Sequence, residues 1–259
     1  MRLAIAFCGV CLAFSASAGD PAREQAYADA IQQQPAIGEA VWLQTGDGGR
    51  FLALFVDAEK TANEQVVIIL HDADGHPDQQ PLIRELRTVL PRHRWASLAI
   101  QLPLREAGAA LEDYYPLVGE ADARIQAAID HAIKIGAKQI AMVGYGIGAA
   151  MAAARLSQNP ANVVAFAAIS LPVPDSSQAG VQTLSFVKNI NLPLLDVYAE
   201  ADWPDVTETA VKRRIACKEN PVYRQIRIDG DDHAYRQNYP LLVKRVYSWL
   251  ATTIMENQQ

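Results

Sequence analysis

Cysteine is scarce in this sequence, which has only three in 259 residues. Cys8 and Cys11 fall in an apolar N-terminal stretch that we expect to be removed, which leaves Cys217 as the one cysteine of the mature chain. An internal disulfide is therefore excluded, and a domain of this size does not need one even in an oxidising compartment. No histidine lies near Cys217 in sequence, so we interpret it as a packed thiol and not as a catalytic one.

Runs of positive charge are also lacking. Lysine and arginine together number 23 against 29 aspartates and glutamates, which gives a formal net charge of -6 at pH 7. Without a basic cluster, the chain is a poor match for nucleic acid or for an anionic membrane surface. The sequence has no heptads, internal repeats or low-complexity tracts, so coiled-coil and repeat architectures are not expected.

The first 18 residues have the three parts of a secretory signal peptide. Arg2 supplies a positive charge, an apolar run extends over 3–14, and Ala16-Ser17-Ala18 forms a small-residue cleavage site. The apolar run is too short to span a bilayer. We therefore expect cleavage after Ala18 and a soluble protein that is periplasmic or secreted.

About 240 residues remain, which is enough for one α/β domain with a sizeable core. Residues 19–36 are polar and rich in alanine, and they predict a loose helix lying against a domain that extends over 37–259. A Gly/Asp cluster at 46–49 separates two strand-like runs and indicates a β-hairpin. The run from Gln65 to Leu70 consists almost entirely of valine, isoleucine and leucine, as expected of a strand that is buried on both faces of a parallel sheet.

Strands and helices then alternate along the chain. We expect strands at 40–45, 50–56, 65–70, 95–101, 139–143, 163–169, 193–198 and 223–228. We expect helices near 80–90, 116–135, 181–188, 206–217 and 240–255, and one that begins at a corner after 143 and ends near 157. In the helix near 116–135, the apolar residues that we expect on its buried face recur at helical spacing, namely Ile125, Ala128, Ile129 and Ile133. This order predicts a mostly parallel central sheet with an antiparallel N-terminal hairpin, helices on both faces and no large lid.

The most informative stretch is the corner Gly144-Tyr145-Gly146-Ile147-Gly148, between a buried strand and an alanine-rich helix. Its shape is that of a nucleophile elbow, G-x-S-x-G, which presents a serine on a strained strand-to-helix turn. The central residue here is Gly146. Strain of this kind costs a non-glycine residue on the order of 1–3 kcal/mol, whereas glycine tolerates a positive φ at little cost. A glycine corner is what we expect of a scaffold released from acyl transfer.

Polar residues follow the predicted strands at their carboxyl ends, which is where sites lie in open α/β sheets. They are His71, Asp72, Asp74 and His76 after the third strand, Ser170 after the sixth, Asp202 after the seventh and His233 after the last.

This order of residues, with Gly146 in the nucleophile position, resembles the α/β-hydrolase superfamily over nearly the whole chain from the hairpin onward. The resemblance implies that Asp202 and His233 occupy the acid and histidine positions of a triad. Through residues 42–43, 51–54 and the His71 loop, the chain also resembles a family of uncharacterised bacterial envelope proteins of this fold. That narrower resemblance carries no established activity.

The resemblance also implies an oxyanion hole made by the backbone amides of Ile147 and of one residue in the His71 loop, for which Asp72 is the candidate. Carboxylates at Asp72 and Asp74 would oppose a developing oxyanion. No cofactor is implied. We expect three further residues to contact a ligand, namely His71, Tyr145 and Ser170.

Several of these residues have plainer interpretations. Asp202, taken alone, is a turn residue about as often as a catalytic acid, and Asp196 inside an apolar strand indicates a structural pair. The acid and histidine side chains of the 71–76 loop could instead ligate a metal. No helix there supplies ligands four residues apart, so a turn is the interpretation we prefer, and we assign no metal site.

Two functional hypotheses follow. The first is a non-catalytic binding or accessory protein of the cell envelope, whose partner is an unknown small molecule or envelope protein. The second is a weak or unconventional ester or amide hydrolase in which His233 and Asp202 activate a water molecule. If that pair lies beside the corner, Gly146→Ser is expected to restore some esterase activity.

Overall fold

The centre of the molecule is an eight-stranded sheet with the strand order β1-β2-β4-β3-β5-β6-β7-β8. It is seen in a computed structural model that describes residues 19–33, 37–160, 162–175 and 181–256. The expected signal peptide, 1–18, lies outside the described residues. Strand β2 pairs antiparallel with both β1 and β4, and the other neighbouring pairs are parallel. The predicted parallel sheet with an antiparallel N-terminal hairpin is therefore confirmed.

The strands lie close to their expected positions. Their bounds are β1 Glu39–Gln44, β2 Arg50–Val56, β3 Gln65–Leu70, β4 Ala96–Ile100, β5 Gln139–Tyr145, β6 Val163–Ile169, β7 Leu194–Ala201 and β8 Tyr223–Asp232.

Strand β3 shows why the apolar runs are continuous. Val66, Ile68 and Leu70 pack into one hydrophobic cluster, and Val67 and Ile69 pack into another on the opposite face. Successive side chains of a strand point to opposite faces, so a strand that is covered on both sides needs an apolar residue at every position. All five side chains are fully buried.

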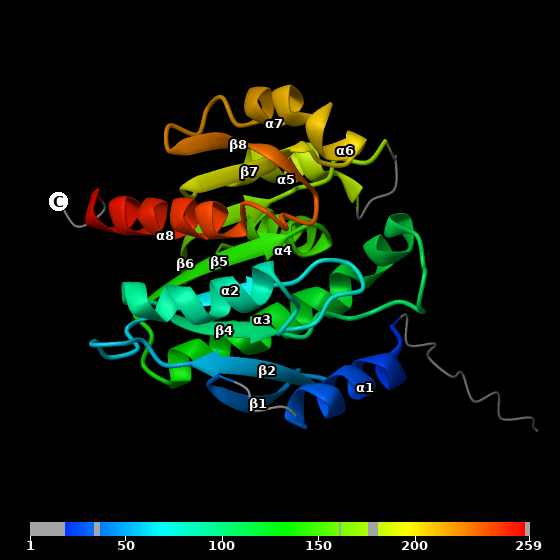
Figure 1. Cartoon of the computed structure of the whole chain (residues 1–259), viewed down its shortest axis with the longest axis vertical. Helices are drawn as coiled ribbons and strands as arrows, with labels where there is room; N and C mark the ends of the chain where they lie inside the picture. Colours follow the sequence, from blue (N-terminus) through cyan, green and yellow to red (C-terminus); the bar gives the residue numbers. More distant parts are fainter. Residues whose placement is uncertain (1–18, 34–36, 161, 176–180, 257–259) are drawn as a thin grey trace, which may run out of the picture.

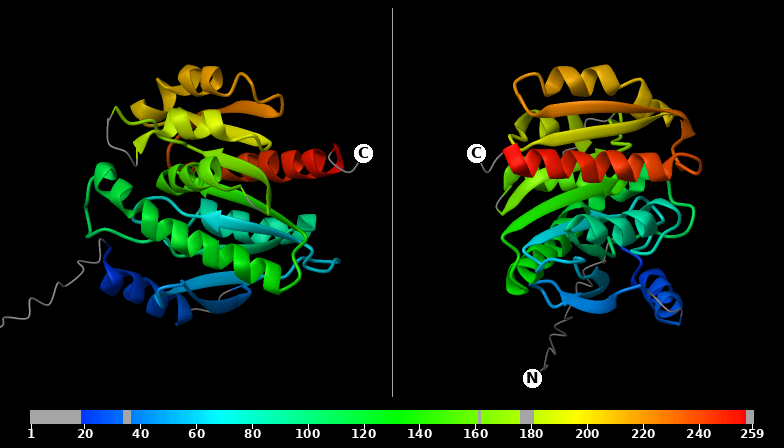
Figure 2. Two further views of the ribbon diagram at one scale, coloured as in Figure 1. Left: turned by 180° about the vertical axis from the view of Figure 1, so that it is seen from behind. Right: turned by 60° about the vertical axis from the view of Figure 1, so that its left-hand side comes forward.

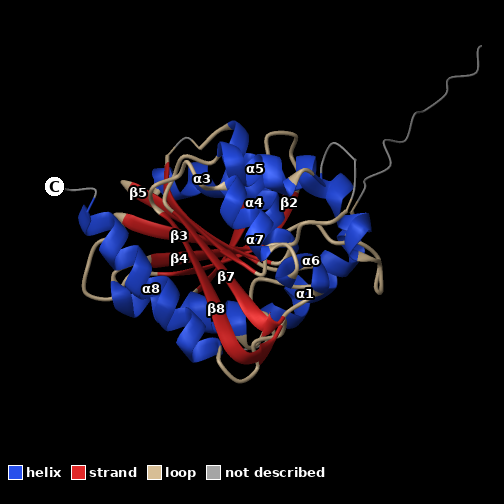
Figure 3. Ribbon diagram, turned by 90° about the horizontal axis from the view of Figure 1, so that it is seen from above, coloured by secondary structure: helices blue, strands red, loops and turns tan. Residues whose placement is uncertain are grey.

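Helices cover both faces of this sheet. Their bounds are α1 Pro21–Gln32, α2 Leu82–Val89, α3 Val118–Lys134, α4 Ile147–Gln158, α5 Thr183–Asn189, α6 Pro204–Thr207, α7 Ala210–Ala216 and α8 Tyr239–Glu256, with short 3-10 turns η1 Leu90–His93 and η2 Leu111–Leu117. Helices α2 and α8 lie on one face, and α3, α4 and α5 lie on the other (Figures 1 and 2). Seen from above, the sheet separates α8 from α4, α5 and α7 (Figure 3).

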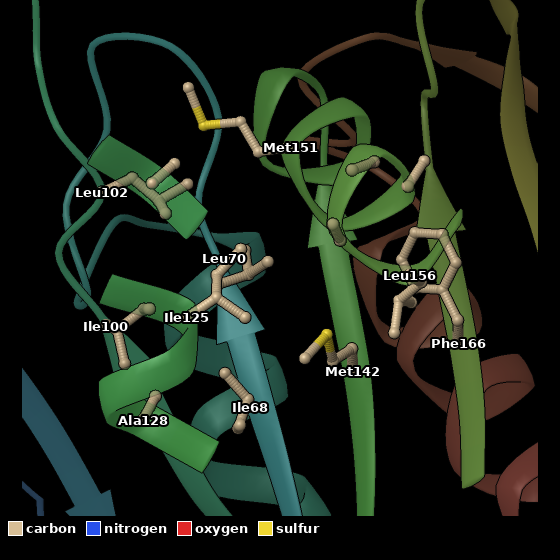
Figure 4. Packing of buried hydrophobic residues seen from close by; sticks show 14 of the residues in the cluster. Ile68, Leu70, Ile100, Leu102, Ile125, Ala128, Met142, Met151, Leu156 and Phe166 are labelled. Atoms are coloured by element: carbon tan, nitrogen blue, oxygen red, sulfur yellow. The ribbon is translucent and has the colours of Figure 1, made fainter. Parts of the chain in front are cut away.

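The larger of the two hydrophobic clusters fills the space between the sheet and helices α3 and α4 (Figure 4). Leu70 of β3, Met142 of β5 and Phe166 of β6 contribute from the strands, and Ile125 and Leu156 contribute from the helices. Burying a side chain of this size stabilises the fold by roughly 1.5–3 kcal/mol. The core therefore holds the carboxyl ends of β3, β5 and β6 in a fixed relation to the start of α4.

The structure corrects two details of the expected helices. The segment expected as one helix over 206–217 forms two, α6 and α7, separated by Glu208 and Thr209. Ile133, which was expected on the buried face of α3, is 45% exposed, whereas Ile125 and Ile129 are buried. Ala132 in the same last turn is fully buried, so Ile133 lies at the solvent-facing margin of the apolar face of α3.

The polar N-terminal segment contains the expected helix, α1, packed against β2. Ala28 and Ile31 form a small cluster with Leu52 and Leu54. Glu24, also on α1, pairs with Arg124 of α3 at 2.8 Å. Across the described ranges, no helix has the length and apolar character needed to cross a membrane.

An ion pair is buried between β7 and α7. Both Asp196 and Arg213 are almost completely shielded from solvent, and their side chains are joined by hydrogen bonds of 2.8 and 3.2 Å. Tyr223 and Gln225 of β8 also donate to the Asp196 carboxylate. The pairing role expected for Asp196 is confirmed.

Asp196→Leu should lower the free energy of unfolding by about 3–5 kcal/mol, because it leaves the Arg213 guanidinium buried without its carboxylate. The double variant Asp196→Leu/Arg213→Met removes both charges and should lose clearly less. Urea unfolding followed by circular dichroism measures both. A double variant as unstable as the single one would contradict this account of the pair.

Candidate functional site

The corner between β5 and α4 has the geometry of an elbow. Gly146 has φ 55° and ψ -120° and stands directly before the first residue of α4. This backbone conformation is strained for a residue with a side chain, and glycine adopts it freely. The start of α4 also lies very close to the end of β3. A Cβ on Gly148 would stand only 2.8 Å from the Leu70 carbonyl oxygen, so this approach requires a glycine.

The Asp72 carboxylate fills the space above this corner. Asp72 Oδ1 accepts a hydrogen bond of 2.7 Å from the backbone N–H of Ile147. A Cβ on Gly146 would lie 2.6 Å from Asp72 Oδ2 and closer still to Oδ1 and Cγ. The first N–H of α4 is also the positive end of the helix dipole, which favours a negative charge there. Asp72 therefore occupies the volume in which the side chain of an elbow residue would stand.

His233 connects this carboxylate to a second one. Its Nε2 donates to Asp72 Oδ2 at 2.8 Å, and its Nδ1 donates to Asp202 Oδ1 at 2.7 Å. The side chains of Asp202, His233 and Asp72 are 0%, 11% and 7% exposed. The structure thus brings together the three expected triad positions, with the carboxylate of Asp72 placed between Gly146 and His233.

Three further groups hold Asp202. The backbone N–H groups of Ala199 and Trp203 donate to its carboxylate at 3.1 and 2.9 Å. Ser170 is fully buried, and its hydroxyl contacts both Asp202 Oδ2 and the hydroxyl of Tyr235, the latter at 2.8 Å. Ser170 was expected to contact a ligand, but this geometry assigns it to the support of Asp202.

Two aromatic rings flank the imidazole of His233. The Trp203 ring is stacked on it with 3.5 Å between ring centroids, and the Tyr145 ring lies at 5.0 Å and an interplanar angle of 25°. Two near-parallel rings at these distances must lie on opposite faces of the imidazole. The Tyr145 hydroxyl donates to the His233 carbonyl oxygen at 2.7 Å, which fixes the loop as well as the ring. Aromatic faces stabilise a cation placed over them.

The electrostatics of the cluster favour a charged His233. Burial lowers the pKa of His233, but hydrogen bonds to Asp202 and Asp72 and the charges of both carboxylates outweigh burial and raise this pKa to about 9. Burial raises the pKa of Asp202, and the hydrogen bonds from His233 and Ser170 bring that pKa below its usual value. At neutral pH the cluster is therefore an imidazolium between two carboxylates.

His71, the other histidine expected in the site, has an internal role. Its Nδ1 donates to the Asp72 carbonyl oxygen at 2.7 Å, and its Nε2 accepts from the Leu102 N–H at 2.9 Å and from the Gln101 amide at 3.0 Å. Burial lowers its pKa to about 3, so it is neutral. In this structure the His71 ring joins the loop after β3 to the chain after β4, and its contact with a ligand stays a prediction.

The loop that carries Asp72 is fastened by the N-terminal helix. Arg23 of α1 pairs with Asp74 Oδ1 at 2.6 Å, and the Tyr27 hydroxyl donates to the Asp74 carbonyl oxygen at 3.1 Å. Tyr114 donates to the same Asp74 carboxylate. Asp74 has a φ of 59°, an uncommon conformation for a non-glycine residue that these contacts maintain.

Like His71, the other three polar side chains of the 71–76 loop each have a partner of their own. Asp72 binds His233, Asp74 binds Arg23, and the His76 ring packs against Tyr27 with centroids 4.8 Å apart. Within the described residues, no three acid, histidine or cysteine side chains are grouped so that they could hold a metal ion.

The sequence did not identify two contributors to the site, Trp203 and Tyr235. Each stands within two residues of a residue that was identified, Asp202 or His233. The sequence could therefore have placed both residues in loops near the site, but the direction of each side chain depends on tertiary packing. The role of Asp72 was only partly anticipated: the sequence placed a carboxylate near the oxyanion hole, and the structure shows it bound to the Ile147 amide.

This sheet order, elbow and site geometry define an α/β-hydrolase fold, and similar solved structures agree. Est1E from Butyrivibrio proteoclasticus matches with a TM-score of 0.66 and 18% identity over 83% of this chain and 99% of that one. The Pyrococcus furiosus esterase Pf2001 matches with a TM-score of 0.68 and 17% identity, covering 83% and 89%. Dienelactone hydrolase from Anabaena variabilis matches with a TM-score of 0.64 and 18% identity, covering 83% and 96%. At these identities the likeness shows the fold alone.

The chain belongs to the family described as "Protein of unknown function (DUF3530)", whose model matches residues 3–116 and 117–252. No curated protein sequence matches it. The expected α/β-hydrolase fold and the expected membership of an uncharacterised family are thus confirmed.

The raised pKa of His233 predicts a loss of stability in alkali. The pKa is about 9 in the folded chain against 6.5 for a free histidine, so the stabilisation is fully present below pH 6.5 and is lost as the pH rises through 9. The free energy of unfolding should fall by on the order of 2–3 kcal/mol between pH 7 and pH 10. Urea unfolding at several pH values measures this. The control double variant His233→Gln/Asp72→Asn has no imidazolium, so its free energy of unfolding should not show this fall between pH 7 and pH 10.

Asp72→Asn should lower the pKa of His233, because it removes one of the two carboxylates that stabilise the imidazolium. The amide keeps nearly the same shape, so the corner should remain filled. Titration of the His233 ring signals by NMR measures the shift. An unchanged pKa would show that Asp202 alone determines the charge of the histidine.

Proposed function

We propose that this protein is an exported, non-catalytic member of the α/β-hydrolase superfamily that acts as a binding or accessory protein of the cell envelope. The observation that carries the proposal is the position of the Asp72 carboxylate. It contacts the Ile147 N–H and His233 Nε2, the two groups that serine chemistry would use, and it fills the space above Gly146.

Each requirement of acyl transfer is opposed by one feature of this arrangement. Gly146 offers no hydroxyl to attack a carbonyl carbon. An oxyanion would need the Ile147 N–H, which already binds a carboxylate. A general base needs a free lone pair, and His233 donates from both ring nitrogens. A substrate carbonyl would have to displace Asp72 before any of these groups became available.

The alternative, hydrolysis by an activated water, requires a neutral His233 with Nε2 free to accept a proton. The pKa of about 9 keeps the ring charged at neutral pH. Only in alkali would the ring lose a proton, and Asp72 would still stand where the water must bind. The cluster therefore favours a structural or ligand-binding use of this end of the sheet.

Export to the envelope rests on the signal-peptide pattern of the first 18 residues. Mass spectrometry of the protein secreted or released from the periplasm tests it. A mature N-terminus at Gly19 is expected, and a protein that starts at Met1 and stays in the cytoplasm would overturn this part of the proposal.

The purified protein should not hydrolyse a panel of short-chain esters, and Gly146→Ser alone should not create activity. The structure revises the expectation of rescue by that single change, because the new Cβ would collide with the Asp72 carboxylate. The double variant Asp72→Gly/Gly146→Ser removes the collision and frees the Ile147 N–H. It should show measurable ester turnover that depends on His233.

The matched control is the triple variant that adds His233→Ala, which should abolish any turnover gained. Circular dichroism and thermal unfolding establish that each variant is folded. Robust turnover by the unmodified protein, lost in His233→Ala, would overturn the proposal. A folded double variant without activity would show that Asp72 is not the sole obstacle to acyl transfer at this corner.

A further inference from the structure

The first residue after the expected cleavage site stands against a cluster of charged side chains. Gly19 directly precedes Asp20, the N-cap of α1, whose N–H donates to the Leu104 carbonyl oxygen at 2.6 Å. A Cβ on Gly19 would lie 3.3 Å from Glu120 Oε2 and 3.4 Å from that carbonyl oxygen. Gly19 is therefore held between the chain after β4 and the first turn of α3.

The cluster beside Gly19 holds more negative than positive charge. Arg124 is paired with Glu24 at 2.8 Å and with Glu120 at 2.6 Å, so one guanidinium serves two carboxylates. The side chains of Arg124, Glu24 and Glu120 are 8%, 10% and 33% exposed. Burial raises the pKa of Glu24 although Arg124 opposes this effect, and the charge of Glu120 adds to the rise. A second cation at this place would balance the cluster.

Cleavage of the signal peptide supplies such a cation. Hydrolysis of the peptide bond between Ala18 and Gly19 consumes one water molecule and yields a carboxylate on Ala18 and an ammonium on Gly19. An α-amine has an ordinary pKa of about 7.7–8.0, so it is mostly protonated at neutral pH. Its nitrogen and a Cβ are bonded to the same Cα about 2.5 Å apart, which leaves the nitrogen at most about 6 Å from Glu120 Oε2. Opposite charges within about 4–6 Å favour the charged form of each group.

Other charges also act on this ammonium. The first turn of α1 presents the positive end of the helix dipole, which disfavours a cation nearby. The Asp20 carboxylate caps the same helix end and offsets that dipole. Arg105, in the chain after β4, is paired with Glu106 at 3.0 Å. The ammonium is therefore held only if its attraction to Glu120 outweighs the dipole.

We propose that the α-ammonium released by cleavage docks on the Glu120 carboxylate and completes a four-charge cluster with Glu24 and Arg124. The docked terminus anchors α1, the helix that fastens the loop carrying Asp72. Removal of the signal peptide thus finishes the packing that supports the site. This inference rests on the export part of the proposed function, because the ammonium exists only if the chain is cut after Ala18.

The first test measures the pKa of the α-amine in the mature chain, residues 19–259, labelled with ¹³C at the glycine Cα atoms. NMR titration of the Gly19 signal should give a pKa of about 8.5–9, above the ordinary value, because the carboxylate stabilises the ammonium. Glu120→Gln should return this pKa to about 7.7–8.0. The matched control is Glu219→Gln, which removes an exposed carboxylate after α7 at the opposite edge of the sheet and should leave the pKa raised.

The second test compares the melting temperatures of the free and the Nα-acetylated mature chain. The α-amine can be acetylated selectively near pH 7, because lysine amines with a pKa of about 10.4 stay protonated there. Acetylation should lower the melting temperature by about 2–4 °C, whereas the helix dipole alone predicts no change or a rise. In Glu120→Gln, acetylation should not lower the melting temperature, because the partner of the ammonium is already gone.

The link to the site is tested by deuterium exchange of the backbone amides in the 71–76 loop. Exchange there should be about three- to fivefold faster in the acetylated chain, because α1 is less firmly anchored. Unchanged exchange would show that docking of the terminus does not reach this loop, and that part of the inference would be wrong.

An ordinary α-amine pKa that Glu120→Gln does not change would overturn the inference, and so would a melting temperature that does not fall on acetylation. Either result leaves the proposed function intact. A natural N-terminus other than Gly19 would also overturn the inference, since the ammonium would not form at this place. The compartment in which that chain is found reports separately on export.

Discussion

The contact between the Asp72 carboxylate and His233 determines the character of this end of the sheet. It places a negative charge at the first N–H of α4 and stabilises an imidazolium that is also paired with Asp202. The same carboxylate needs a corner without a side chain, because a Cβ at position 146 would occupy its space. Gly146, Asp72 and His233 are thus three parts of one arrangement, and each is fitted to the other two.

A buried cluster of this kind is stable only if its charges are compensated. Two carboxylates around one imidazolium leave a net negative charge, and desolvating such groups is expensive unless hydrogen bonds replace the lost water. Here the Ile147 N–H serves Asp72, while the Ala199 and Trp203 N–H groups and the Ser170 hydroxyl serve Asp202. Trp203 and Tyr145 cover the faces of the ring. The cluster is thereby completed by groups at the carboxyl ends of three strands, β5, β6 and β7.

Much of the fold could be predicted from the sequence because strands buried on both faces have an unmistakable pattern. The run 163–169 and the run 65–70 coincide with β6 and β3, since every position in them after Gln65 is apolar. The break between α6 and α7 was missed because helical spacing continues across it. Ile133 was misplaced because spacing alone does not show how wide the buried face of a helix is: Ala132 beside it is fully buried.

The order of residues along the chain also placed Gly146, Asp202 and His233 at one edge of the sheet. It could not show which way Asp72 points, because that direction depends on tertiary contacts. Arg23 and Tyr27 of α1, nearly fifty residues earlier in the chain, hold Asp74 and thereby fix the loop two residues beyond Asp72. A helix that the sequence presents only as a polar appendage therefore helps to position the carboxylate. The chemistry of the corner is set by this long-range packing, and for that reason an elbow pattern in a sequence specifies the backbone of a site well and its reactive groups incompletely.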